Sequence, residues 1–219
     1  MYGALCRKAR EGKSKKRAKW QSIPTPIDFA DLLDCRIPDR MKEVYLCAKF
    51  AEFVKAHGYN HKVDLRFSEI GGYQLASTEL VGYVILDAGL IMCRALFDLL
   101  GIYYSPRNDD LQERNSRKPD DVCLSHFRLD TGHLSRITLD QAFHNPPLTP
   151  VQMKKPLLET LRRANKAIGH VTTVRGRELS MDDVIITCHH ILRLLNIHLY
   201  QALRRSQVAF DDGVAWYDL

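Results

Sequence analysis

One short segment of the C-terminal half, residues 161–173, combines side chains that together could perform acid–base chemistry on a phosphate. Arg163 and His170 are seven positions apart, so they share one face of an α-helix, and Asn165 and Lys166 lie between them. A histidine titrates near neutral pH and can take a proton from a hydroxyl group. An arginine stays charged and binds phosphate oxygens through two parallel hydrogen bonds. We therefore predict that His170 is a catalytic base, that Arg163 stabilises charge on a phosphate, and that Asn165 and Lys166 position its oxygens.

Spacing alone does not select this pair, because an arginine followed by a histidine after four to six intervening residues occurs three times. The other two pairs are Arg128–His133 and Arg193–His198. The last pair would lie about 140° apart on a helix and point in different directions, and the first falls in an irregular stretch. The position of Gly169 favours Arg163 and His170 as the catalytic pair, because a glycine lets the chain turn beside the histidine. The alternative is that His170 only interacts with carbonyl groups at a helix end, next to a solvated arginine.

The residues around this pair, Ala-Asn-Lys-Ala-Ile-Gly-His-Val-Thr at 164–172, are similar to a segment of HEPN-superfamily proteins of the abortive-infection type. They depart from that segment at Ala164, where the family usually has a polar residue. The resemblance implies a helix bundle that acts as a metal-independent endoribonuclease of a toxin or phage-defence type. It also implies RNA as substrate, a homodimer with a shared site, an antitoxin or another protein as partner, and no cofactor or metal.

Two carboxylates on a second helix are candidates to complete this site. Tyr83, Asp87, Arg94 and Asp98 fall within a narrow arc of the long apolar helix expected at about residues 75–100. Asp87 or Asp98 could orient His170 if that helix packs against the segment. The alternative is that the arc is a solvent-exposed face, with an ordinary pair between Arg94 and Asp98.

The last predicted helix offers further candidates for substrate binding. His189, Arg193 and Asn196 share one stripe of that helix, which could also face residues 163–170. The neighbouring His190 points about 100° away from His189. No spacing of histidine and cysteine in the chain is typical of a closed metal site.

The excess positive charge of the chain is concentrated at its N-terminus. Residues 1–20 contain eight lysines and arginines and one glutamate, a net charge of +7, so the other 199 residues carry −1 of the total +6. We expect this stretch to be a disordered basic arm that attracts nucleic-acid phosphates, with a solubilising tail as the alternative. We also expect a cytoplasmic protein without a membrane span. No 18-residue window is free of charge, no secretory signal is evident, and the six cysteines form no C-x-x-C pair.

Helical periodicity predicts a single helical domain over residues 21–219. Helices are expected at about residues 39–56, 75–100, 150–169 and 181–205. Residues 105–121 are expected to form a polar loop, and residues 122–139 a short hairpin or irregular cover. The predicted fold class is therefore mainly α, a HEPN-like helix bundle with a short irregular or β-hairpin insertion.

Local signals refine these helices. Thr149 followed by Pro150 is a strong helix start, Pro156 predicts a kink or a restart, and Ser180 resembles the cap of a capping box. Three apolar stripes are predicted to face the core. They are Val44, Cys47, Ala48, Ala51 and Val54 in the first helix, Leu80, Val84, Ile91, Leu96 and Leu99 in the second, and Val184, Cys188, Ile191, Leu192, Leu195 and Leu199 in the last.

Two other functions remain open at this stage. The first is a non-catalytic helical module that binds RNA or a partner protein through the basic arm and a face of the bundle. The second is a helical protein-interaction subunit with no role in nucleic-acid binding.

Overall fold

The computed structural model describes residues 28–59, 63–67, 71–75, 78–114, 121–145, 147–165 and 180–210. The predicted basic arm, residues 1–20, lies outside this part of the chain, as do His170 and Lys166.

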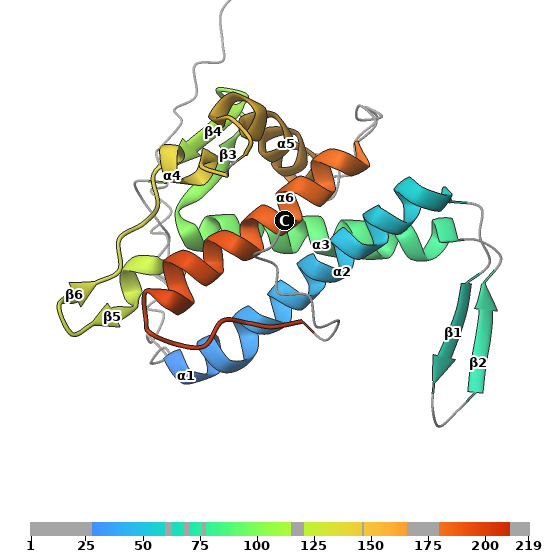
Figure 1. The fold of residues 1–219 in the computed structure, drawn as a ribbon, viewed down its shortest axis with the longest axis horizontal. Coiled ribbons are helices and arrows are strands. Elements are labelled where there is room, and N and C mark those ends of the chain that lie inside the picture. Colours follow the sequence, from blue (N-terminus) through green and yellow to red (C-terminus); the bar gives the residue numbers. More distant parts are fainter. Residues whose placement is uncertain are drawn as a thin grey trace, which may run out of the picture.

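Three long helices form the centre of the fold. They are α2 (Ile37–His57), α3 (Thr78–Leu100) and α6 (Met181–Leu195), and α2 packs along both of the others (Figure 1). The predicted apolar stripes of the first and last helices are all buried in their common core. The prediction of a mainly α, bundle-like fold is confirmed. None of the helices in the described part of the chain is long and apolar enough to cross a bilayer.

The three helices come closest where their small residues meet. A Cβ atom added at Gly89 of α3 would lie 2.2 Å from the Cβ atom of Cys47 on α2, so only glycine permits this approach. The Sγ atoms of Cys93 on α3 and Cys188 on α6 are 3.7 Å apart. Contacts with Cys47 and Cys93, together with burial, raise the pKa of the Cys188 thiol. The Cys188 thiol is therefore unreactive, and all three cysteines act as small core residues.

The second helix, α3, presents a different face to the core than its sequence predicts. Leu86, Leu90, Cys93, Phe97 and Leu100 are buried, as are the predicted Leu96 and Leu99, whereas Val84 and Ile91 are 69% and 41% exposed. The helix is apolar on nearly every side, so hydrophobicity alone does not define its inner face.

The helices at both ends of the bundle continue through wider turns. The short helix α1 (Phe29–Asp31) and the π-helical turn η1 (Leu32–Arg36) lead directly into α2, so the helix begins before the predicted Asp39. At the other end, α6 continues into the π-helical turn η4 (Asn196–Gln201). The Tyr200 hydroxyl donates a hydrogen bond of 3.0 Å to the Leu33 carbonyl, which joins the two turns.

In the described part of the chain, three antiparallel hairpins interrupt the helices. The first, β1 (Val63–Phe67) with β2 (Gly71–Leu75), joins α2 to α3 and projects away from the bundle (Figure 1). The second, β3 (Ile102–Ser105) with β4 (Asp110–Glu113), follows α3 after Gly101, whose φ of 102° ends the helix. The third, β5 (Arg128–Leu129) with β6 (Gly132–His133), follows the 3₁₀ turn η2 (Leu124–His126). The hairpin expected within residues 122–139 is thus present, whereas the loop expected at 105–121 contains a strand.

The remaining two helices lie on one side of the bundle. After α4 (Leu139–Phe143), helix α5 (Pro150–Arg163) begins at the predicted Thr149, whose side chain forms a capping box with Gln152. The helix is continuous through Pro156, which neither ends nor restarts it. By contrast, the Ser180 side chain forms no capping hydrogen bond at the start of α6, so the predicted capping box is absent. A buried hydrogen bond of 3.1 Å between the Thr160 and Thr187 hydroxyls joins α5 to α6.

Candidate functional site

The end of α5 packs against the middle of α3, which brings two parts of the predicted site together. The side chain of Arg163 lies within electrostatic reach of Asp87 on α3. Burial raises the pKa of the Asp87 carboxyl group, and the positive charge of Arg163 opposes this shift. The long helix α3 therefore packs against the end of α5, which is the condition for Asp87 or Asp98 to approach this segment, although His170 itself lies outside the described residues.

Two consecutive arginines at this end of α5 have different roles. The guanidinium group of Arg162 forms a double hydrogen bond with Asp109, at 3.0 and 2.9 Å, and a further one with Glu159. Asp109 lies in the β3–β4 turn with a positive φ of 51°, so Arg162 holds a turn that has a strained backbone. Arg163 forms no ion pair within 4 Å with another described residue. Arg162 is therefore an anchor of the fold, and Arg163 is available to a ligand.

The residue between Arg163 and Asn165 belongs to the core of the fold. Ala164 is only 1% exposed and packs in the hydrophobic core. A polar side chain at this position would be buried, so alanine suits the packing of α5. Arg163 and Asn165 are half-buried on either side of it.

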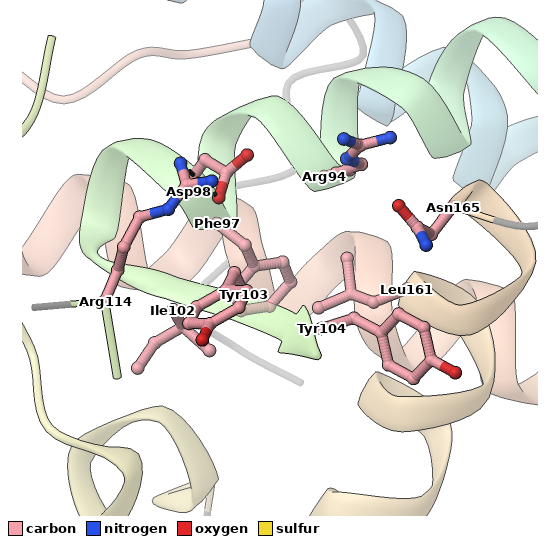
Figure 2. Close-up of a pocket in the computed structure, with 9 residues that line it drawn as sticks. All are labelled: Arg94, Phe97, Asp98, Ile102, Tyr103, Tyr104, Arg114, Leu161 and Asn165. Carbon is pink, nitrogen blue, oxygen red and sulfur yellow. Dashed lines mark ion pairs between the residues drawn. The ribbon is translucent and has the colours of Figure 1, made fainter. Parts of the chain in front are cut away.

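A small pocket opens between α3, β3 and the end of α5. It has a volume of about 50 Å³. Arg94 and Asn165 lie on one side of the pocket, and Asp98 and Arg114 on the other (Figure 2). Its walls and floor also include apolar and aromatic side chains, namely Phe97, Ile102, Tyr103, Tyr104 and Leu161.

The acidic side of the pocket is firmly held. Asp98 forms an ion pair with Arg114 at 3.2 Å. It does not form the Arg94–Asp98 pair that the sequence suggests. The Arg114 guanidinium group also lies over the Tyr103 ring, 5.4 Å from its centroid, and is 3.8 Å from Asp121. On the other side, Arg94 is exposed and forms no ion pair within 4 Å with another described residue, and the Asn165 amide forms no hydrogen bond with one.

The two substrate-binding candidates on α6 lie elsewhere. His189 contacts Glu52 on α2, with 2.9 Å between its Nε2 atom and the carboxylate, and burial lowers its pKa. Arg193 donates hydrogen bonds to the His144 carbonyl at 3.2 Å and to the Asn145 side chain at 3.0 Å. The structure therefore brings Arg163, Asn165, Asp87 and Asp98 to the α3–α5 junction, but not His189 and Arg193.

Comparisons with known proteins give no relative for this arrangement. No family model, no curated protein and no solved structure matches the chain. Within the described ranges, no group of three or more His, Cys, Asp or Glu side chains is placed to hold a metal ion.

The chemistry that the junction offers is the binding of an anion. Arg94 and Arg163 present cations there that form no ion pair within 4 Å with another described residue, and Asn165 adds an amide group that can donate hydrogen bonds. Sequence reasoning treated Arg94 only as a partner of Asp98 and did not identify Arg114. The polar arc on α3 already contained Arg94, but Arg114 reaches the pocket only because the chain folds back after the β3–β4 hairpin.

Proposed function

We propose that this protein binds RNA at the α3–α5 junction and cleaves it without a metal ion, as the HEPN resemblance suggests. Arg163 stabilises charge on the phosphate at the cleavage site, and His170, seven residues further along the chain, is the base. The observation that carries the proposal is the position of Arg163 at the junction, within electrostatic reach of Asp87 but without an ion pair within 4 Å to another described residue, close to the pocket that Asn165 and Arg94 line. We further propose, from the same resemblance, a homodimer of a toxin or phage-defence type.

The reaction requires only the groups that this segment supplies. His170 takes the proton of a ribose 2′-hydroxyl group, whose oxygen attacks the neighbouring phosphorus atom. The bond to the 5′-oxygen breaks, that oxygen takes up a proton from water, and a 2′,3′-cyclic phosphate remains. Arg163 stabilises the negative charge that develops on the phosphate oxygens during the attack.

Cleavage of a labelled single-stranded RNA in the presence of EDTA tests this proposal. His170→Ala should reduce the rate by a factor of roughly 10² to 10⁴, as the loss of a general base does. Arg163→Ala should reduce it by roughly 10² or more. Arg40→Ala is the matched control, because it removes one exposed positive charge from α2, away from the junction, and should leave the rate within about twofold. An unchanged rate for His170→Ala would show that this assignment is wrong.

A non-catalytic RNA-binding module is the second candidate. It is favoured by the composition of the described junction, where the cations and the amide are accompanied by carboxylates but by no histidine. If the wild-type protein binds RNA through Arg163 but does not cleave it, this second function replaces the first.

A further inference from the structure

We infer that the pocket between α3, β3 and the end of α5 binds a backbone phosphate of the RNA strand, and that Asp98 makes it prefer a phosphodiester to free phosphate. This inference rests on RNA being the ligand, as proposed above. It adds a second point of contact, distinct from Arg163, and a charge selectivity that the proposed cleavage does not require.

The size of the pocket suits one small anionic group. A volume of about 50 Å³ can hold a few water molecules. A phosphate group, with its four oxygen atoms around one phosphorus atom, replaces about that number of waters.

The donors on one side of the pocket suit such a group. Arg94 presents a planar, permanently charged guanidinium group, which binds two oxygens of a phosphate at once. Asn165 approaches from the end of α5, so its amide can donate to a third oxygen (Figure 2). Neither side chain has an ion pair or hydrogen bond with another described residue, so neither must break such a contact to bind.

The opposite side of the pocket sets the charge of the ligand. Among the pocket-lining residues, Arg94 and Arg114 carry two positive charges and Asp98 carries one negative charge. Arg114 is paired with Asp98 and lies 3.8 Å from Asp121 outside the lining, so the excess positive charge in the pocket is that of Arg94. A phosphodiester carries one negative charge and matches this excess. Free phosphate carries a second negative charge near neutral pH, which Asp98 repels.

The position of the pocket relative to Arg163 suits one continuous strand. Arg163 lies near Asp87, and Arg94 follows Asp87 by seven residues on the same face of α3. Seven residues advance an α-helix by about 10 Å. A single strand that runs along this side of α3 can therefore place one phosphate at Arg163 and another in the pocket.

Binding of an uncleavable RNA tests the contact independently of catalysis. The probe is a fluorescein-labelled single strand of about ten nucleotides with 2′-O-methyl groups, titrated by anisotropy at several salt concentrations. Arg94→Ala should weaken binding about tenfold and reduce the slope of log K against log[salt] by about 0.7, as the loss of one phosphate contact does. The control Arg40→Ala should stay within about twofold, and circular dichroism should show both variants folded. If Arg94→Ala binds like Arg40→Ala, the pocket does not hold a phosphate.

Competition against the same probe tests the selectivity without any variant. Dimethyl phosphate, a monoanionic diester, should displace the probe from the wild-type protein at concentrations at least several-fold lower than inorganic phosphate. Asp98→Asn should reduce this difference by strengthening the competition from inorganic phosphate. Equal competition by the two ions in the wild type would overturn the selectivity. An absence of cleavage by the wild-type protein would refute the proposed nuclease but leave these binding results intact, because the probe cannot be cleaved.

Discussion

Acidification should destabilise the protein through one buried histidine. The His190 side chain is 1% exposed, and its Nε2–H group donates a hydrogen bond of 2.6 Å to the Ala142 carbonyl. Its Nδ1 atom is buried without a hydrogen-bond partner among the described residues. A proton on Nδ1 would therefore place an unpaired positive charge in the core. The His190 side chain avoids this cost by remaining neutral in the folded protein.

The magnitude follows from the pKa of this side chain. Burial lowers the pKa of His190 from 6.5 to about 4; the hydrogen bond to Ala142 opposes the shift, and the nearby charges of Arg193, His144 and His198 add to it. The unfolded chain takes up the proton near pH 6.5, so the free energy of unfolding falls as the pH drops below that value and towards 4. The expected loss from His190 alone is about 2 kcal/mol at pH 5 and about 3 kcal/mol at pH 4.

Urea unfolding of wild type and His190→Gln at pH 7, 5 and 4 measures this loss. Glutamine does not titrate, and its amide can still donate to the Ala142 carbonyl. Groups other than His190 titrate in both proteins, so their effects cancel when the two pH dependences are subtracted. We expect wild type to lose about 3 kcal/mol more than the variant between pH 7 and pH 4. Identical pH dependence in the two proteins would refute the idea that His190 is held neutral in the core.

Two further predictions concern the helix contacts. Thr160→Val should cost about 1–2 kcal/mol because it leaves the buried Thr187 hydroxyl without its partner, and Thr160→Val combined with Thr187→Val should cost less than the sum of the two single changes in urea unfolding. Gly89→Ala should lower the free energy of unfolding by about 2 kcal/mol or more, seen as a lower Tm, because the new methyl group overlaps Cys47. If the effects of the two threonine changes on the free energy of unfolding simply add, the two hydroxyls do not stabilise each other. If Gly89→Ala leaves the Tm unchanged, α2 and α3 are not in close contact at Gly89.

The sequence predicted the buried residues of helices whose apolar positions recur at helical spacing. It did not predict them in α3, where apolar residues lie on more than one side of the helix. The buried residues of α2 and α6 recur at helical spacing, so periodicity identified them, although α2 also carries the exposed apolar residues Leu46 and Phe53. In α3 both sides are apolar, and the inner face is decided by close approach at Gly89, which periodicity does not record. The β3–β4 hairpin was missed because its turn is held by Arg162, 53 residues away from Asp109 in the chain.

The candidate site was predictable in its local parts only. Arg163 and Asn165 followed from their types and spacing, and Asp87 and Asp98 followed from a shared arc on α3. The sequence could not show which face of α6 meets the end of α5, because that depends on how the neighbouring helices pack around α6. His189 turns towards Glu52 on α2 for this reason, away from the end of α5.

The cysteines at the centre of the bundle provide a natural probe of its opening. Cys47, Cys93 and Cys188 are completely buried where α2, α3 and α6 meet, whereas Cys35 is exposed. A water-soluble thiol reagent should modify Cys35 at once and reach the three core thiols only when the helices separate. Cys123 at the η2 turn is buried as well, so labelling is followed at each cysteine by mass spectrometry. The slow phase at Cys47, Cys93 and Cys188 then measures how often the central core opens in the native protein, without any introduced label.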